Sequence, residues 1–211
     1  MKQPHPYHHG NLKEALLEAA LQHIDTAGPQ GITLREVARR AGVSHNAPYR
    51  HFADKDELLA AVAAQGFERL TAAMNAEAAA AGTAADRLRL TGRGYVGFAL
   101  EYRKHFSVMF DRPPSAHSYA EYSAAARRAF EVLMDAIKAC QDAGDLPAGD
   151  PTPFAFTAWS LVHGIAKLAI AGQFPFRTTA DVLGFTDRAT RGLLEGILKK
   201  PASPRRRRLK R

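Results

Sequence analysis

The sequence predicts an all-α protein, and three observations point to that fold class. Apolar residues recur every three or four positions along most of the chain, no segment shows the convincing alternation of a strand, and helix-capping residues precede several of the periodic segments. At 211 residues the chain can bury a full core without a metal or a disulfide. It has one cysteine, Cys140, in an apolar helical stretch, and its first ten residues hold no apolar secretion segment. We therefore expect a helical protein of the reducing cytoplasm, with Cys140 in its core.

The first two predicted helices have recognisable boundaries. The stretch 11–28 places leucine and alanine at helical spacing and ends at a glycine. The stretch 34–41 opens with a capping box formed by Thr33 and Glu36, and it ends at Gly42. These signals predict a helical pair at the N-terminal end of the fold.

The longest predicted helix starts with a second capping box. Asp54 and Glu57 form this box, and the alanine-rich run after them favours a helix that can extend to Gly82. Stretches rich in proline and glycine separate the later helical segments. The remaining helices are expected at about 84–104, 105–110, 118–143, 153–171 and 179–200.

Pro48 lies where the second helix of a helix-turn-helix would run, after Gly42 as the sharp turn and Val43 as the apolar residue beneath it. An interior proline costs a helix about 3 kcal/mol or more. If Ser44 is the N-cap, Pro48 is the fourth helical residue and one terminal hydrogen bond is lost; if Asn46 is the cap, nothing is lost. In both registers we expect a helix with a late start. Spacing alone fits a generic helical hairpin equally well.

The net charge of +8 is unevenly distributed. Residues 199–211 hold eight Lys and Arg and no acid, so the rest of the chain carries 21 basic and 21 acidic side chains. This composition predicts a disordered tail, which either binds phosphate backbones without sequence preference or only keeps the protein in solution. Within the neutral remainder, residues 33–55 hold five basic and two acidic side chains. That local excess is typical of a nucleic-acid contact.

The stretch GITLREVARRAGVSHNAPYRHFADKDELL closely resembles the DNA-binding domain of the TetR (tetracycline-repressor-like) family of bacterial regulators. The shared residues are Thr33 at a helix start, AGVS at 41–44, YRHF at 49–52 and Lys55 after an acidic cap. The resemblance covers about residues 7–62 and implies a three-helix head with a helix-turn-helix. The sequence departs from the family at positions 47 and 48, where many members carry Thr and Leu.

The resemblance assigns ten residues to contacts with double-stranded DNA. Hydroxyl, phenol, imidazole and ammonium groups at helix ends can donate to phosphate oxygens, whereas short polar side chains at the start of the second helix can reach base edges. Tyr49 can alternatively belong to the core, and His51 can cap a neighbouring helix. The phosphate candidates are Thr33, Tyr49, His51 and Lys55, the base candidates are Arg35, His45, Asn46 and Ala47, and Ser44 and Arg50 complete the set.

One further motif, WSLVHG at 159–164, looks like the Trp-His-Gly motif of one branch of TetR C-terminal domains. The helix that carries it, 153–171, is apolar on nearly every side. Its central His163, Gly164 and Lys167 argue against a membrane span. We therefore expect one side to be buried by its own domain and the other by a partner.

The last predicted helix, 179–200, carries a single apolar stripe. With the 153–171 helix, the resemblance implies a four-helix interface in a homodimer, which a palindromic DNA site requires. The stripe alone fits an intramolecular core face equally well. It consists of Val182, Phe185, Ala189, Leu193 and Ile197.

The resemblance also implies a pocket for an unidentified small-molecule effector in the C-terminal part. Aromatic and methionine side chains on the helices that enclose this pocket are the candidates, although most are expected to be ordinary core. Tyr102 and His163 are the polar handles. The candidates are Phe98, Tyr102, Phe106, Met109, Phe110, Phe130, Met134, Trp159 and His163.

These expectations divide the chain into a DNA-binding head (1–56), an effector-binding and dimerisation domain (57–200) and a basic tail (201–211). We expect a repressor that a small molecule releases from a palindromic operator, with no cofactor. An enzyme is not expected, because the one dense histidine group, HPYHH at 5–9, has no carboxylate or cysteine nearby. The rival interpretation is a ligand-independent DNA-binding protein that organises the chromosome.

Overall fold

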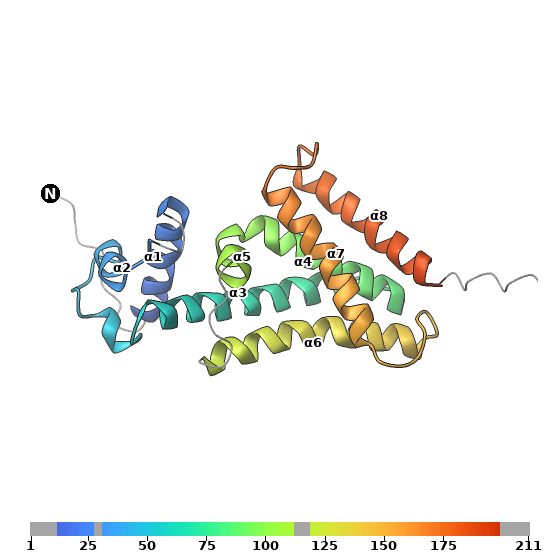
Figure 1. Ribbon diagram of the computed structural model, residues 1–211, viewed down its shortest axis with the longest axis horizontal. Coiled ribbons are helices and arrows are strands. Elements are labelled where there is room, and N and C mark those ends of the chain that lie inside the picture. The colour runs from blue at the N-terminus through green and yellow to red at the C-terminus, as the bar shows by residue number, and fades with distance from the viewer. Residues whose placement is uncertain (1–11, 28–30, 112–118, 199–211) are drawn as a thin grey trace, which may run out of the picture.

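Helices make up most of the part of the chain that the structure describes. The computed structural model describes residues 12–27, 31–111 and 119–198, and within these ranges it contains eight α-helices, one 3-10 turn and no strand (Figure 1). The predicted all-α fold class is confirmed. The predicted tail at 201–211 and the histidine group at 5–9 lie outside the described residues.

A small helical head lies at one end of the molecule (Figure 1). It consists of α1 (Leu12–Ala27), α2 (Leu34–Arg40), the 3-10 turn η1 (Pro48–Arg50) and the first turns of α3 (Lys55–Ala78). Apolar side chains from these segments pack together, and their core is continuous with that of the rest of the molecule. Its most deeply buried members include Leu16, Val37, Phe52 and Leu58.

The turn after α2 has the geometry that its sequence predicts. Thr33 caps the start of α2, because its Oγ1 accepts a hydrogen bond from the Glu36 N–H at 3.2 Å. At the other end Gly42 has φ of +69°. The N–H groups of Gly42 and Val43 donate to carbonyls three and five residues back, at 3.3 and 3.0 Å. This pair of bonds is a Schellman cap, which glycine adopts without a Cβ penalty.

The second helix of the helix-turn-helix differs from the prediction: it is the single 3-10 turn η1, not an α-helix that starts at Ser44 or Asn46. Pro48 has no N–H to donate to the Ser44 carbonyl, which accepts from the Ala47 N–H at 2.9 Å instead. The next bonds also span three residues, the pattern of a 3-10 helix. Pro48 is the first residue after the cap, Ala47, and its ring is buried.

The long helix α3 runs without a break from the head into a larger helical domain, so the predicted boundary after residue 56 lies in its first turn. It ends at Ala78 rather than near Gly82. Three helices pack around α3, and two more cover the other side of α4 (Figure 1). They are α4 (Ala84–Glu101), α5 (Arg103–Phe110) and α6 (Ala120–Asp142), followed by α7 (Thr152–Ile170) and α8 (Thr179–Leu198).

α3 and α4 cross closely at Gly94. A Cβ atom at position 94 would lie 2.7 Å from the Ala73 carbonyl oxygen and 2.8 Å from the Met74 Cα. Real side chains do not approach backbone atoms so closely. The distance between the two helices therefore depends on a residue without a side chain.

The apolar stripe of α8 faces the interior of its own chain. Val182 is 7% exposed, Phe185 and Ala189 pack against the main core, and Leu193 lines an internal cavity. α4 and α7 of the same chain pack against α8, so the stripe contributes to the core of its own domain. Phe185, Ala189 and Leu193 are only half-buried, and the prediction that the stripe forms a dimer seam stays a prediction. The side chain of Ile197 lies outside the described part.

One helix, α7, is long and apolar enough to cross a membrane by length and composition alone. In this fold it packs against α4, α6 and α8. A single helix of this kind is weak evidence for a membrane span. Its opposite side stays at the surface, where Phe156 is 51% and Leu168 is 46% exposed and Ser160 lies between them. This outer strip of α7, Phe156–Ser160–Leu168, is partly apolar and uncovered within the described chain.

Candidate functional site

The ten predicted DNA contacts lie on segments of the head, at one end of the molecule: the start of α2, the turn after it, η1 and the start of α3 (Figure 1). Thr33 is the N-cap of α2 and Lys55 is the first residue of α3, so both lie at helix N-termini, where backbone N–H groups favour anions. The other eight lie in the first turn of α2, the turn 44–47, η1 and its C-cap. Nine of the ten are exposed and Ala47 is half-buried. They are Thr33, Arg35, Ser44, His45, Asn46, Ala47, Tyr49, Arg50, His51 and Lys55.

Of the three aromatic side chains in and directly after η1, one is buried and two are exposed. Phe52 is 2% exposed and belongs to the head core, whereas Tyr49 is 58% exposed. The His51 ring packs beside Phe52, with ring centroids 6.3 Å apart, and remains exposed. Tyr49 is therefore not a core residue, and its hydroxyl and the His51 imidazole are available to a partner.

The positive charge of the head is partly used inside the protein. The Glu36 carboxylate accepts two hydrogen bonds from Arg39, at 2.6 and 2.8 Å, and one from Arg40 at 3.3 Å. The Arg39 bonds lower the pKa of Glu36 to about 2, so this carboxylate stays ionised. Among the described residues Arg35 and Lys55 form no ion pair. The exposed Arg50 of η1 likewise forms no ion pair with a described residue. The cations available to a phosphate or a base therefore lie at the start of α2, in η1 and at the start of α3.

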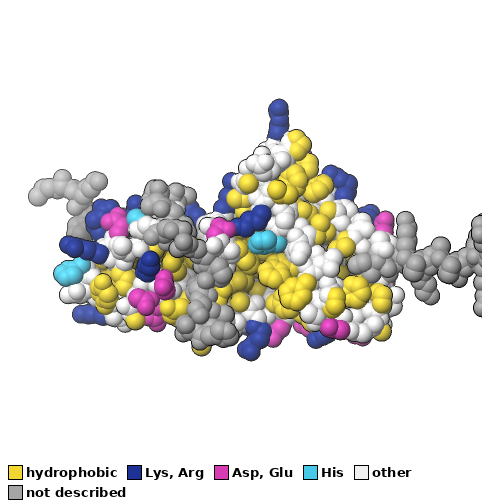
Figure 2. All heavy atoms as spheres, viewed as in Figure 1, with side chains coloured by type: hydrophobic (Ala, Val, Ile, Leu, Met, Phe, Trp, Pro, Cys, Tyr) yellow, Lys and Arg dark blue, Asp and Glu magenta, His cyan; other side chains and the backbone are white. Residues whose placement is uncertain are grey.

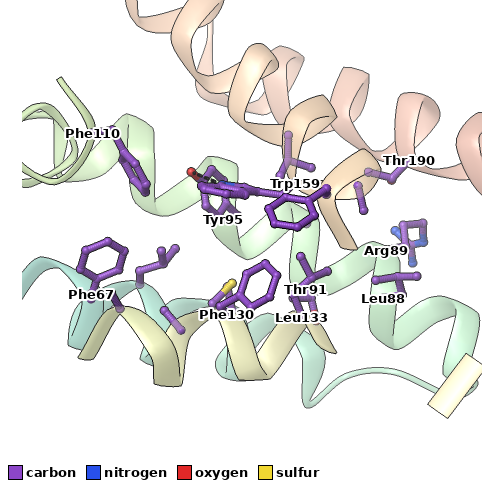
Figure 3. Close-up of a pocket in the computed structure, with 18 of the residues that line it drawn as sticks. Phe67, Leu88, Arg89, Thr91, Tyr95, Phe110, Phe130, Leu133, Trp159 and Thr190 are labelled. Atoms are coloured by element: carbon purple, nitrogen blue, oxygen red, sulfur yellow. Dashed lines mark hydrogen bonds between the residues drawn. The ribbon is translucent and has the colours of Figure 1, made fainter. Parts of the chain in front are cut away.

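A large apolar cavity lies inside the C-terminal domain, between α3, α4, α5, α6, α7 and α8. Its volume is about 480 Å³, within the range of pockets for drug-sized molecules. Figure 3 shows an elongated space with Phe67 and Phe110 at one end, Arg89 and Leu88 at the other, and Tyr95, Trp159 and Phe130 between them. Figure 2 shows hydrophobic side chains at the surface between α6 and α7, and Phe156, which lines the cavity, is half-exposed. The cavity therefore reaches the surface beside α7.

A chain of hydrogen bonds crosses the wall of the cavity. The Trp159 Nε1–H donates to the Tyr95 hydroxyl at 3.2 Å, and the Tyr95 hydroxyl is 2.8 Å from His163 Nδ1. Burial raises the pKa of Tyr95 and lowers the pKa of His163, so both are neutral near pH 7. The pair Trp159 and His163, four residues apart on α7, is thus joined through a residue of α4.

One end of the cavity is closed by ion pairs. The Arg89 guanidinium donates to Asp187 at 2.6 Å and to Asp86 at 3.3 Å. Arg93 donates to the second oxygen of Asp187 at 2.9 Å and to Glu77 at 3.1 Å. These bonds tie α3, α4 and α8 together at the end of the cavity far from the head.

The structure brings four of the nine predicted pocket residues to the cavity wall: Met109, Phe110, Phe130 and Trp159. The other five lie elsewhere. Phe98 and Phe106 are 1% exposed and are core, as expected of most candidates. Tyr102 stacks on Phe98 with Arg69 over its ring, and Met134 packs in a smaller cluster with Phe130. His163 lies behind the cavity wall, against Tyr95, Phe110 and Trp159.

Several residues that form the cavity wall were not predicted from the sequence. Tyr95, Arg89 and Thr91 come from α4, and Phe67 and Tyr122 come from α3 and α6. Their apolar or amphipathic spacing is the same as that of ordinary core. The available signal was the glycine-rich stretch TGRGYVGF at 91–98, since three glycines within one helix indicate close approaches around Tyr95.

Two family descriptions match the chain. Residues 16–62 match "Bacterial regulatory proteins, tetR family", and residues 88–193, half of the chain, match "Tetracyclin repressor-like, C-terminal domain". A curated relative, an HTH-type transcriptional repressor of Mycobacterium tuberculosis, is 36% identical over 66 residues, which are 31% of this chain. The chain spans about a third (35%) of the length of that relative.

Solved structures match over nearly the whole fold. A protein of unknown function from Rhodococcus sp. RHA1 is 34% identical, with a TM-score of 0.76, over 90% of this chain and 98% of its own. A bacterial regulatory protein of the tetR family from Rhodococcus RHA1 is 26% identical, with a TM-score of 0.70, over 88% of this chain and 96% of its own. The two family descriptions cover both parts of the chain, and the solved structures share its whole fold. The chain therefore belongs to the TetR family of bacterial transcriptional regulators and is not an enzyme.

Proposed function

We propose that this regulator is a cytoplasmic repressor that binds a palindromic operator as a homodimer and leaves it when a small molecule fills the cavity. The observation that carries the proposal is the position of α3. This helix begins with Lys55 at the exposed tip of the head, and three turns later Phe67, Leu70 and Met74 line the cavity. One rigid element thus takes part in both sites.

The head is suited to contacts with a DNA duplex. Thr33, Tyr49, His51 and Lys55 expose donors at or near helix ends, which suits phosphate oxygens and fixes the register of a protein on DNA. His45 and Asn46 project from the turn before η1, and Arg35 from the first turn of α2. Asn46 suits adenine and Arg35 suits guanine.

A homodimer would cover the outer strip of α7. Phe156 and Leu168 are large apolar side chains at the surface, and each partner would bury the strip of the other across a two-fold axis. The exposed side of α8, with Gly192 and Gly196, lets a second helix approach closely. A two-fold protein presents its two heads to the two halves of a palindrome.

The small helix α5 supports a coupling between the cavity and the head. Met109 and Phe110 line the cavity, while the same helix packs against α1 of the head. Its buried His105 lies 3.0 Å from the Gln65 side-chain oxygen of α3. A molecule that moves Phe110 would therefore act on α1 and α3 together, and it can shift DNA binding by as much as its affinities for the two arrangements differ.

Repression is the direction of regulation that the relative from Mycobacterium tuberculosis suggests, since it is described as a repressor. That match covers 66 residues, whereas the residues that line the cavity run from Phe67 to Leu194. The match is therefore too short to include the whole cavity, and it does not indicate a shared effector. The chemistry of the effector has to be inferred from the cavity wall.

The experiment that tests this proposal is a binding-site selection with the full-length chain and random duplexes. We expect an inverted repeat whose half-sites are separated by about one helical turn, roughly 10 base pairs, because two heads would read one face of the duplex. Enrichment of no sequence, together with steep loss of all binding as salt rises, would instead favour the chromosome-organising alternative.

A further inference from the structure

Three hydrogen-bond donors of the cavity wall are already used within the protein. Thr91 and Thr190 each donate the hydroxyl proton to a backbone carbonyl one turn earlier in the same helix, at 2.9 Å. Trp159 donates its indole N–H to Tyr95. A ligand that needs to receive a hydrogen bond finds these protons engaged.

The direction of the bonds at Tyr95 follows from Trp159 and from the tautomer of His163. An indole N–H can only donate, so the Tyr95 oxygen accepts from Trp159. In the neutral His163 tautomer that carries its hydrogen on Nε2, Nδ1 is an acceptor and Tyr95 gives its own proton to it. A hydroxyl oxygen has two lone pairs, and Trp159 uses one of them. The second is free to accept a proton from a molecule in the cavity, and the Thr91 and Thr190 oxygens offer acceptors of the same kind.

The charges at the wall are balanced within the protein. Arg89 donates to Asp187 at 2.6 Å and to Asp86 at 3.3 Å, so two carboxylates already balance its charge and would repel an anionic ligand at its remaining N–H groups. No aspartate or glutamate is among the described residues that line the cavity, so a cation would be desolvated without a counter-charge. Both signs of charge are therefore disfavoured.

From these contacts we infer that the cavity takes an uncharged, mostly apolar molecule with a hydroxyl or neutral N–H group, and that the Tyr95 oxygen accepts this proton. The inference rests on the proposed function in one respect, that the cavity is the effector site. It adds the chemical class of the effector and the residue that selects it. Tyr95 then reads the polar group, while Phe67, Phe110 and Phe130 contact the apolar body.

The test uses three naphthalenes that differ in one group: naphthalen-2-ol, 2-methoxynaphthalene and naphthalene-2-carboxylate. Each is titrated calorimetrically into the full-length chain without DNA. We expect the naphthol to bind about twofold to tenfold more tightly than the methoxy compound, the ratio that one net hydrogen bond gives. The carboxylate should bind most weakly. Equal affinities for the naphthol and the methoxy compound would overturn the assignment, as would no binding of any of the three.

Two tyrosines of the cavity wall provide a matched pair of variants. Tyr95→Phe should remove the preference for the naphthol, and Tyr122→Phe should keep it; the ratio between two similar ligands is insensitive to a general change in cavity shape. Ala126→Phe should fill the cavity and abolish binding, whereas the exposed control Ala72→Phe should not. If the carboxylate bound most tightly and Arg89→Gln removed that preference, the effector would be an anion and the inference wrong.

The two proposals fail in different ways. Naphthol binding that depends on Tyr95 but leaves operator affinity unchanged would count against the coupling to DNA and not against the ligand class. Operator release by an anionic molecule would support the coupling to DNA and count against the ligand class.

Discussion

The crossing of α3 and α4 at Gly94 allows a quantitative test of the packing that joins the head to the cavity. In Gly94→Ala the new methyl group would lie 2.7 Å from the Ala73 carbonyl oxygen and 2.8 Å from the Met74 Cα, whereas ordinary contacts begin at 3.4 Å. Both neighbours are backbone atoms of α3, so no side chain can rotate away, and the helices must separate by about the shortfall of 0.7 Å. Overpacking of this kind costs about 1–3 kcal/mol, and the upper part of that range applies because the obstacle is rigid.

The higher helix propensity of alanine returns about 1 kcal/mol, so the net loss in the free energy of unfolding is about 2 kcal/mol. For a chain of this size that lowers the melting temperature by roughly 4–8 °C. Gly97→Ala, three residues along the same helix, is the matched control, because its Cβ would meet nothing closer than a Leu183 methyl at 4.0 Å. It should gain about 0.5–1 kcal/mol. Thermal denaturation of both variants at one protein concentration decides the matter. If Gly94→Ala melted with or above Gly97→Ala, the close crossing would not exist as described.

Three further variants test other parts of the account. Leu168→Glu places a charge in the outer strip of α7 and should convert the dimer to a monomer in sedimentation, whereas the exposed Ala72→Glu on α3 should not; a wild-type monomer at micromolar concentration would contradict the proposed dimer. Pro48→Leu restores an N–H that can bond to the Ser44 carbonyl, so it should fold and dimerise but change operator affinity or preference; early melting with unchanged operator binding would mean that the buried ring serves packing only. Burial lowers the pKa of His105 from its ordinary 6.5 to about 4, so the unfolded chain takes up this proton first. The free energy of unfolding should therefore keep the full contribution of a neutral His105 above pH 6.5 and fall by roughly 3 kcal/mol between pH 6.5 and pH 4. His105→Gln should flatten this pH dependence in thermal melts; an equally steep profile in the variant would exclude His105 as the cause.

The helical segments of the head could be predicted because their signals are local. The Thr33 and Asp54 caps and the turn at Gly42 depend on residues within five positions of each other, and the structure contains all three. The conformation of η1 was harder to predict from the sequence. Whether Pro48 joins an α-helix or a 3-10 turn depends on which N–H reaches the Ser44 carbonyl, and composition does not decide that competition.

The cavity could be predicted only in part, because cavity wall and solid core use the same residue types. Phe106 and Phe110 are four residues apart on one helix, yet the first is packed on all sides and the second lines the cavity. Tyr95 and His163 are 68 positions apart and meet only once α4 and α7 cross. The α8 stripe is a related case: periodicity shows that a helix has an apolar face, but it does not show which neighbour covers that face.

The most direct test of the account is the ratio between the affinity for the selected operator and that for a scrambled duplex of equal length, at physiological salt. For the wild-type chain we expect a ratio of about a thousand or more, as is usual for sequence-specific regulators. Asn46→Ala should reduce the ratio, by about 1–3 kcal/mol for each lost base contact, whereas Lys55→Ala should weaken both affinities alike and leave the ratio nearly unchanged. A wild-type ratio near one would contradict the claim that this head reads DNA sequence.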